Sequence, residues 1–425
     1  MRISRQRLAQ CRYRIPLIEK VSQKPPDKEK KLATSLRFCR RWVPFLAVLI
    51  TSYASAAADS PQTMAGHAGL MYVGTLDHKI LVIDQDKEEV VGEIPLTGIA
   101  RTTALSADQT QLYVINTKMT IEIVDLAARK VVGTIDLTES GSRPRITATS
   151  RNWLAGGANG RFSGLAVDPT GHYLYTTLRV VTKDIDQYRL DPPKFVAIDV
   201  QNKTIAKSFD FPTGFDLGFG FNASYKVSPD GKSLYVFDED VLVFDLDKFT
   251  LVDRIPLSKP PYPGASPYRL TVTDDPYDDQ TTVTSVYTSV DSVVHKGTLG
   301  LASLNLLTKE VKYNPIGPAL PMLGFLVSPD RKRGYSVMFT GAGANRPVEW
   351  WVWDIETHRV IKKEPFEGRP TFRFAVSSDG KKLYLYGAGS SLEIFDAETL
   401  KSRKLIFLNK DVTTNLVTPI RAGGD

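Results

Sequence analysis

The sequence predicts an all-β fold, a seven-bladed β-propeller made of four-stranded antiparallel blades. A four-strand pattern recurs seven times along the chain, and most copies hold two polar turns of similar composition at the same places. No useful length of helical periodicity interrupts the series. The composition agrees, because 10% of the 425 residues are aromatic, with 17 Tyr and 19 Phe, and aromatic residues favour strands.

The clearest copy covers residues 226–255. An apolar run ends at the turn that begins with Ser228, and a second strand, Leu234–Phe237, leads into a third, Val241–Phe244. A polar turn that begins at Asp245 then reverses the chain into a fourth strand. Asp and Ser suit these turns because their side chains can hydrogen-bond the backbone amides of the reversing chain.

The other copies repeat the third strand and the first turn. Seven third strands are closed by Asp or Asn: Ile80–Asp84, Ile121–Asp125, Phe195–Asp199, Val241–Asp245, Leu301–Asn305, Trp350–Asp354 and Leu392–Asp396. Five first turns match: Ser106–Asp108, Asp168–Gly171, Ser228–Gly231, Ser328–Asp330 and Ser377–Gly380. The fifth copy departs most, with Thr273–Pro276 in the turn and Val286-Tyr287 in the second strand. Within Trp350–Trp353, alternation along the strand predicts that part of the aromatic run is inter-blade core.

The first copy lacks an inner strand, because Gly69–Val73 already matches a second strand. The segment Val412–Pro419 has no blade of its own and is similar to the inner strand Thr371–Ser378. We therefore expect the C-terminal strand to complete blade one, which closes the ring and removes two exposed strand edges.

The Ser-Pro-Asp-Gly-Lys turn, the Leu-Tyr-Val strand and the Val-Phe-Asp strand resemble the YVTN-type seven-bladed propeller repeat family over about residues 69–420. This superfamily includes the propeller subunits of quinoprotein amine dehydrogenases and lactonase propellers. The resemblance implies the fold and leaves the function open, because one fold hosts many activities.

The basic charge lies in the leader. The whole chain has a net charge of +7, but residues 1–58 contain 13 Lys and Arg against 3 Asp and Glu, which leaves 41 basic and 44 acidic residues in the remainder. This distribution removes the main support for nucleic-acid binding. An apolar run, Trp42–Ser52, follows an Arg pair and precedes small residues with cleavage sites after Ala56 or Ala58.

The run is shorter than the ~20 residues that a membrane span needs, so we expect a signal peptide over about 40–58 and a periplasmic or secreted product with no stable membrane span after cleavage. The alternative is that the run is retained as a membrane anchor. Cys11 and Cys39 both precede the run. The exported chain then has no disulfide, thiolate metal site or Cys nucleophile. The expected domains are the leader with its signal peptide (1–58), an N-terminal arm (59–68), the propeller (69–420) and a tail (421–425).

The two faces of the ring differ. In an antiparallel meander the turns between strands one and two and between strands three and four share one face, here called the short-turn face. The long connections fall on the opposite, long-loop face, which we expect to carry function. They are residues 138–163, 212–225 and 258–268 between blades and residues 179–194, 289–298 and 340–348 within blades. The segment Ala155–Gly160 has no strand-loop-helix context for a phosphate cradle and reads as a flexible loop.

Arginines near the starts of inner strands predict a ligand site in the central channel, where guanidinium groups can hold an anion by paired hydrogen bonds. The candidates are Arg101, Arg161, Arg369 and Arg373. Candidate partner-binding residues of the long-loop face are Arg151, Trp153, Phe219, Tyr262 and Arg346. The alternative for all of them is ordinary loop solvation and inter-blade ion pairing.

No catalytic or metal constellation is evident. His78, His172 and His358 fall in or beside hairpin turns, and neither His67 nor His295 completes a set with metal-ligand spacing. No Gly-x-Ser-x-Gly nucleophile motif occurs. We expect no metal, no cofactor and no catalytic residue in this chain.

Three functions remain open. The first is an exported, non-catalytic propeller that binds a protein partner or a small anionic ligand through its long-loop face. The second, which the resemblance implies, is an accessory subunit of a periplasmic quinoprotein amine dehydrogenase, whose cofactor would sit on another chain. The third is a lactonase-like hydrolase, which needs a carboxylate, a His and an Arg inside the channel.

Overall fold

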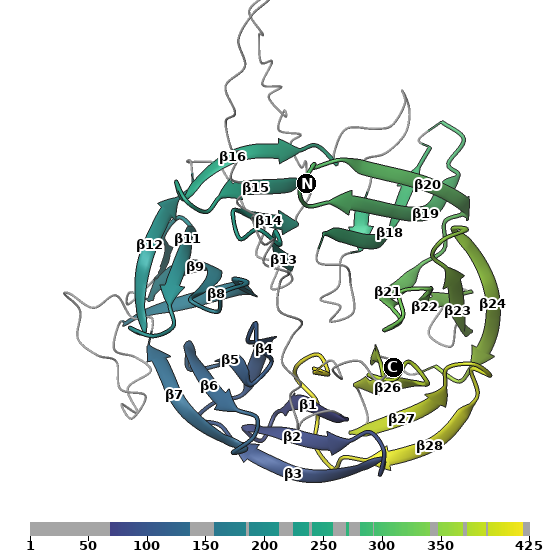
Figure 1. The fold of residues 1–425 in the computed structure, drawn as a ribbon, viewed down its shortest axis with the longest axis horizontal. Coiled ribbons are helices and arrows are strands. Elements are labelled where there is room, and N and C mark those ends of the chain that lie inside the picture. Colours follow the sequence, from purple (N-terminus) through teal and green to yellow (C-terminus); the bar gives the residue numbers. More distant parts are fainter. Residues whose placement is uncertain are drawn as a thin grey trace, which may run out of the picture. The chain divides into compact units, whose positions relative to one another are not determined.

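The computed structural model describes residues 69–136, 157–183, 187–211, 224–237, 240–257, 269–271, 281–291, 293–340, 347–368, 372–387 and 390–419. These residues form 28 strands and no helix, and the strands pair into seven antiparallel sheets around a central axis (Figure 1). None of them therefore belongs to an apolar helix long enough to cross a membrane. The predicted all-β propeller with seven blades is confirmed.

The blades follow one another along the chain. Blade one contains β1 (Leu70–Thr75), β2 (Lys79–Asp84) and β3 (Glu89–Pro95); blade two contains β4 (Ala100–Leu105), β5 (Gln111–Asn116), β6 (Thr120–Asp125) and β7 (Lys130–Asp136). Blade three contains β8 (Gly157–Val167), β9 (Tyr173–Lys183), β10 (Tyr188–Leu190), β11 (Lys194–Asp199) and β12 (Thr204–Asp210). Blade four contains β13 (Ser224–Val227), β14 (Ser233–Phe237), β15 (Val241–Asp245) and β16 (Thr250–Ile255).

The last three blades keep the same order. Blade five contains β17 (Arg269–Thr271), β18 (Thr282–Val290), β19 (Gly297–Asn305) and β20 (Val311–Pro318). Blade six contains β21 (Met322–Val327), β22 (Arg333–Phe339), β23 (Val348–Asp354) and β24 (Arg359–Phe366). Blade seven contains β25 (Phe372–Val376), β26 (Lys382–Gly387), β27 (Ser391–Asp396) and β28 (Ser402–Phe407).

The repeated turns owe their shape to local hydrogen bonds. In blade four the Ser228 hydroxyl donates to Asp230 Oδ1 at 2.5 Å and accepts from the Ser233 amide at 2.9 Å. At the other turn, Asp245 Oδ1 accepts from the Lys248 amide at 2.8 Å. The same contacts recur in other blades. Because each contact spans five residues or fewer, the turns are encoded locally and their motif is structural.

The fourth strand of every blade joins the third strand through a register shift, a β-bulge, which lies just before the closing Asp in six blades and between Leu299 and Gly300 in blade five. In blade four it lies between Val243 and Phe244. A bulge increases the local right-handed twist of a strand pair. The outer strands therefore turn away from the plane of their blades and wrap the rim of the ring.

Seven hydrophobic clusters lie between the blades, and each cluster joins two neighbouring blades. Blade six shows how one strand serves both interfaces. Trp350 of β23 packs on Phe374 of blade seven, with ring centroids 5.4 Å apart, whereas Trp353 belongs to the cluster shared with blade five. Both indoles are fully buried, which confirms that the aromatic run is inter-blade core.

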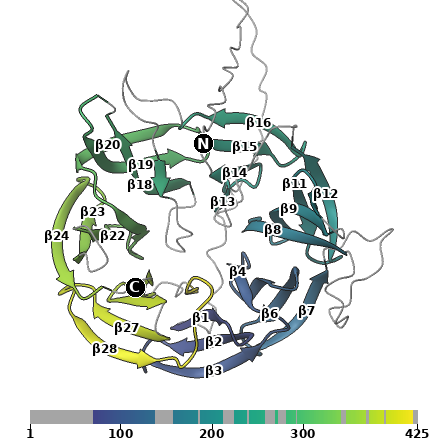
Figure 2. The ribbon, with the colours of Figure 1, turned by 180° about the vertical axis from the view of Figure 1, so that it is seen from behind.

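The C-terminus closes the ring as expected. Residues 410–419, here called the closing segment, lie beside β1, where the last and first parts of the chain meet (Figure 2). Tyr72 and Val417 exchange backbone hydrogen bonds of 2.9 and 2.8 Å, and the Thr413 amide donates to the Gly74 carbonyl at 2.8 Å. A Cβ on Gly74 would lie 2.6 Å from Ala100 Cβ and 2.8 Å from Thr414 Cγ2, so glycine allows this close approach. The pairing consists of two isolated bridges and not of a full strand.

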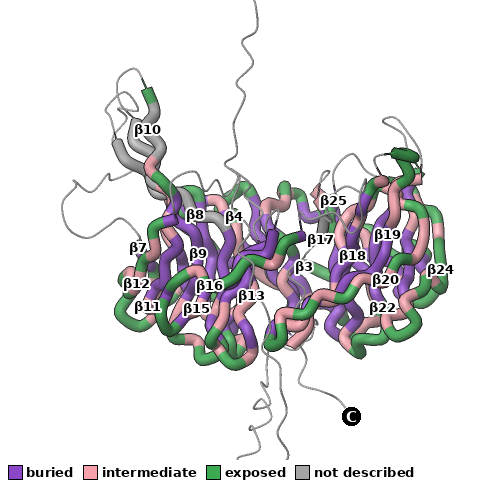
Figure 3. The backbone as a smooth tube through the Cα atoms, turned by 90° about the horizontal axis from the view of Figure 1, so that it is seen from above, coloured by how far each residue is buried: buried purple, intermediate pink, exposed green. Residues whose placement is uncertain are grey.

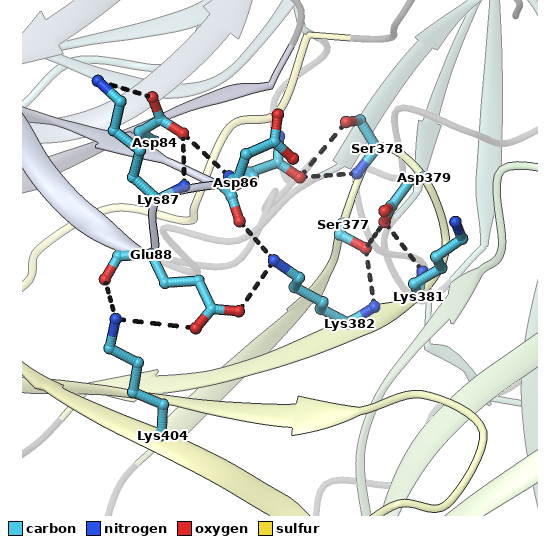
Figure 4. A network of polar contacts seen from close by, with 11 residues as sticks. Asp84, Asp86, Lys87, Glu88, Ser377, Ser378, Asp379, Lys381, Lys382 and Lys404 are labelled. Atoms are coloured by element: carbon cyan, nitrogen blue, oxygen red, sulfur yellow. Dashed lines mark hydrogen bonds and ion pairs between the residues drawn. The ribbon is translucent and has the colours of Figure 1, made fainter.

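Ion pairs reinforce the same seam on both faces. On the short-turn face, Lys382 Nζ lies 2.9 Å from Glu88 Oε1, and Lys404 donates to the Glu88 carbonyl at 2.9 Å (Figure 4). On the long-loop face, Lys410 of the closing segment pairs with Glu93 and lies 2.9 Å from Asp77 Oδ2. Ion pairs therefore hold blades one and seven together in addition to hydrophobic packing.

The predicted connections contain more strand than expected, most of all in blade three. Residues 157–163 and 179–183 were expected in connections, yet they belong to β8 and β9, which pair from Gly157–Lys183 inward. The predicted flexible loop Ala155–Gly160 is therefore wrong for Gly157–Gly160. Cross-strand pairing overrides the weak strand propensity of these small residues, and β10 adds a third strand on the other side of β9. Figure 3 shows buried residues along the strands of the ring and exposed residues at its turns.

Candidate functional site in the central channel

The charged residues on the described innermost strands are all basic. The free edges of β4, β8, β13, β17, β21 and β25 face the central axis (Figure 1). Five of these six strands carry one basic residue each, and none of the six carries Asp or Glu. The basic residues are Arg101, Arg161, Lys226, Arg269 and Arg373. Residues 59–425 contain slightly more acidic than basic residues, so overall composition does not explain this excess.

Strand register sets the height of each basic residue along the channel. The second strand of each blade runs from the short-turn face to the long-loop face. A common reference is its residue that pairs two positions before the closing Asp or Asn of the third strand, which is Tyr113, Tyr175, Tyr235, Thr284 and Tyr384 in the five blades concerned. Lys226 pairs with that reference residue, Arg373 two residues beyond it, Arg101 between two and three beyond it, and both Arg161 and Arg269 four beyond it. At about 3.3 Å per residue, the five positions span roughly 13 Å along the strands.

Arg101 and Arg373 lie on the inner strands of the two blades that flank blade one. Both side chains are exposed on inner strands, at nearly the same height. Arg373 Nη1 donates to the Thr413 carbonyl at 3.3 Å. Ala100, the neighbour of Arg101, approaches Gly74 on the same side as Thr414. The closing segment thus lies between the two arginines, which flank blade one.

Arg101 also occupies an irregular position. The register of β4 on β5 shifts between Ala100 and Thr102, so Arg101 lies within the irregularity. A bulge of this kind redirects a side chain relative to the regular strand alternation. The inner strands of blades three and six carry comparable shifts.

The remaining sequence-predicted residues have different outcomes. Arg161 lies in β8 opposite Arg179. Arg369, Arg151, Trp153, Phe219, Tyr262 and Arg346 lie outside the described residues. Sequence reasoning missed Lys226 and Arg269, although both precede recognised first turns. A comparison of the inner strands by charge, blade by blade, could have found them.

A buried glutamate side chain hydrogen-bonds the connection that leads into blade two on the long-loop face. Glu122 of β6 is fully buried, and its oxygens accept from the Thr97 amide at 3.0 Å and from Asn116 Nδ2 at 2.8 Å. Thr97 lies in the connection between β3 and β4, the strand that carries Arg101. Glu122 therefore positions the backbone that leads to Arg101.

The ionised groups at the seam have structural partners. Burial opposes ionisation of Asp77, but hydrogen bonds from Thr75 and Lys410 and the charges of Lys410 and Lys79 hold the pKa of this carboxyl below its ordinary value. Hydrogen bonds from Lys410 and Lys79 likewise lower the pKa of Glu93. These carboxylates stay ionised at neutral pH, and their charge is matched by lysines of the same seam.

The described histidines lie away from the inner strands. His78, His295 and His358 have positive φ values of 63°, 53° and 54°, as expected for tight turns, and His172 follows the first turn of blade three. Within the described ranges no group of three or more His, Cys, Asp or Glu side chains could hold a metal ion. The carboxylate, His and Arg group of a lactonase-like site is not assembled among these residues.

Comparisons with known proteins inform the fold alone. No family model matches the sequence, and no curated protein matches it. A functionally unknown protein from Desulfotomaculum acetoxidans DSM 771 is similar in structure, with a TM-score of 0.53, 13% identity and coverage of 83% of this chain and 99% of that chain. The resemblance to the YVTN repeat family thus stays an interpretation of the repeat pattern.

Two other solved structures are more distant. Dihydro-heme d1 dehydrogenase NirN in complex with DHE has a TM-score of 0.48 and 16% identity, with 85% of this chain and 77% of that chain covered. Kuenenia stuttgartiensis hydrazine synthase has a TM-score of 0.45 and 14% identity, with 84% and 98% covered. Similarity of this degree carries no inference about activity.

Proposed function

We propose that this chain is an exported, non-catalytic propeller that binds a small, multiply charged anion in its central channel, entered from the long-loop face. One observation carries the proposal. Five inner strands bring one basic residue each to the channel edge, with no acidic residue on any described inner strand. Cationic side chains of one sign along a channel concentrate anions and bind them through charge-assisted hydrogen bonds.

The stagger of the basic residues favours an anion with more than one charged group. Arg101 and Arg373 stand at nearly the same height, whereas Lys226 and Arg161 stand below and above them. A ligand with two or three carboxylate or phosphate groups can meet several of these positions at once. Export rests on the leader sequence at residues 40–58.

Titration calorimetry of the purified protein with phosphate, pyrophosphate and citrate tests the proposal. We expect citrate or pyrophosphate to bind more tightly than phosphate, and Arg101→Ala to weaken binding about tenfold, since a hydrogen bond to a charged group contributes ~1.5–3 kcal/mol. Arg359→Ala is the matched control, because Arg359 is an exposed arginine on the outer strand β24.

Arg373→Ala is measured with a melting curve beside it, because Arg373 also touches the closing segment. Equal losses from Arg101→Ala and Arg359→Ala would contradict a channel site. Binding that survives the double change Arg161→Ala and Arg369→Ala would remove those two residues from the site. No binding of any of the three anions would refute the proposal.

A further inference from the structure

The hairpin between β18 and β19 presents an apolar tip on the long-loop face. Val290, Val293 and Val294 are 42%, 75% and 59% exposed, and they lie within five residues of one another. Val293 and Val294 are the two most exposed valines among the described residues. Exposed apolar residues that gather in one place mark interaction sites more often than scattered ones.

The strands that carry the tip are unusually long. β18 and β19 have nine residues each, against five each for the equivalent β14 and β15 of blade four. Their pairing is continuous from Thr282–Asn305 to Val290–Gly297. The second and third strands of each blade connect on the long-loop face, so the added length carries the valines toward that face.

Hydrogen bonds tie together the described residues of the tip. Asp291 Oδ1 accepts from the amides of Val293 and Val294 at 2.8 and 3.0 Å, and the Asp291 amide donates to the Lys296 carbonyl at 2.8 Å. His295 takes a positive φ of 53°. These contacts fix the backbone before any partner binds, which lowers the entropic cost of association.

The base of the hairpin is also fixed. The Ala319 amide donates to the Gly297 carbonyl at 2.8 Å, and a Cβ on Gly297 would lie 2.6 Å from Ala319 Cβ. This close approach needs glycine and ties the hairpin to the connection between blades five and six. The valines therefore stand on a rigid support.

We propose that the β18–β19 hairpin tip is a protein-docking element, whose valines enter an apolar pocket with an acidic rim on a partner protein. The acidic rim follows from Lys296, which is exposed beside the valines. Three valines cover far less than the ~800 Å² that each side of a standard interface buries. The tip is thus an anchor within a larger contact on the long-loop face.

A membrane surface fits the tip less well. Stable lipid binding needs a large apolar face or two anchoring signals, and this tip has three small side chains and one lysine in its described residues. The hairpin proposal stands apart from the anion site, because it uses residues on blade five that none of the anion-site variants changes.

Site-specific photo-crosslinking in the producing cell tests the proposal. A benzoyl-phenylalanine at position 293 should give one discrete adduct with a partner protein, whereas the same probe at position 252 should not. Val252 is the matched control, since it is a valine on the outer strand β16 that is 50% exposed. The partner is then purified and titrated against the full chain.

We expect Val293→Ser with Val294→Ser to weaken this binding about tenfold or more, as truncation of an interface anchor does. Lys296→Glu should weaken it further, whereas Val252→Ser should leave it unchanged, with all variants melting as the unmodified protein does. Equal adducts from positions 293 and 252, an adduct with lipid or with a second copy of this chain, or undiminished binding of the double serine variant would overturn the proposal.

Discussion

Removal of residues 410–425 should unfold the protein, because the closing segment is the inner edge of blade one. It makes four backbone hydrogen bonds to β1 and its turn, and Gly74 donates to Thr414 Oγ1 at 2.8 Å. The Leu416 amide donates to the Tyr386 hydroxyl at 2.9 Å. Burial raises the pKa of Tyr386 to about 12, so this phenol stays protonated and keeps its place in the core.

The expected loss is large. Six hydrogen bonds at ~1 kcal/mol each, the burial of Leu416 at ~1.5–3 kcal/mol and the partial burial of Val417 at about half of that value amount to about 9 kcal/mol. A domain has ~5–15 kcal/mol of total stability. The truncated chain should therefore lose its cooperative transition or melt far below the full chain, because the inner edge of β1 and the blade-seven surface are then exposed.

Differential scanning calorimetry and far-ultraviolet circular dichroism measure this directly. A chain that ends after Pro419 is the matched control, since it keeps each of the contacts described here for the closing segment, and it should melt like the full chain. Val417→Pro is a milder variant that removes the amide donated to Tyr72 and should lower the melting temperature without abolishing folding. A 410–425 truncation that melts like the full chain would refute the closure.

Three further predictions concern the seam and the core. Glu88→Gln should lower the melting temperature at pH 7. Burial opposes ionisation of Glu88, but the hydrogen bond from Lys382 and the charges of Lys382, Arg403 and Lys404 lower its pKa below the ordinary value of 4.5. The stabilisation by ionised Glu88 is present above pH 4.5 and is lost as the pH falls through the folded-state pKa. The melting temperatures of the variant and the wild type should therefore converge in acid, and a difference that stays constant with pH would contradict this role. Glu122→Ala should cost ~2–4 kcal/mol in urea denaturation because it strands the Thr97 amide and Asn116, and Glu122→Gln, which keeps an acceptor, should cost less; equal losses would argue against this bonding role. Trp350→Ala should cost ~3–5 kcal/mol in the same assay, and a loss below 1 kcal/mol would show that the site repacks.

The parts of the fold that the sequence revealed are those encoded by short-range contacts. The Ser228 and Asp245 turns satisfy their hydrogen bonds within five residues, so the pattern shows them and their repetition shows the blades. Closure was predictable because an unpaired blade and an unassigned segment, residues 412–419, complement one another. The long-range partners of that segment, such as Lys410 with Asp77 and Glu93, have no local signature.

The rest depended on pairing between distant residues. The glycine-rich start of β8 forms a strand because Lys183 and its neighbours in β9 offer a hydrogen-bonding edge. The composition of residues 155–160 alone does not indicate this edge. The candidate site shows the same limit. Arg101 and Arg373 were recognised individually, but their positions on either side of blade one follow from ring closure. Lys226 and Arg269 were recognised as candidates only when the inner strands were compared.

The location of a bound anion tests the central claim most directly. Crystals grown with selenate or bromide give anomalous peaks that mark anion positions without any assumption about the natural ligand. We predict the strongest peak inside the channel, in contact with Arg101 or Arg373 beside the closing segment. Peaks confined to the outer strands or to the short-turn face, with none along the inner strands, would contradict the proposal that this channel binds anions.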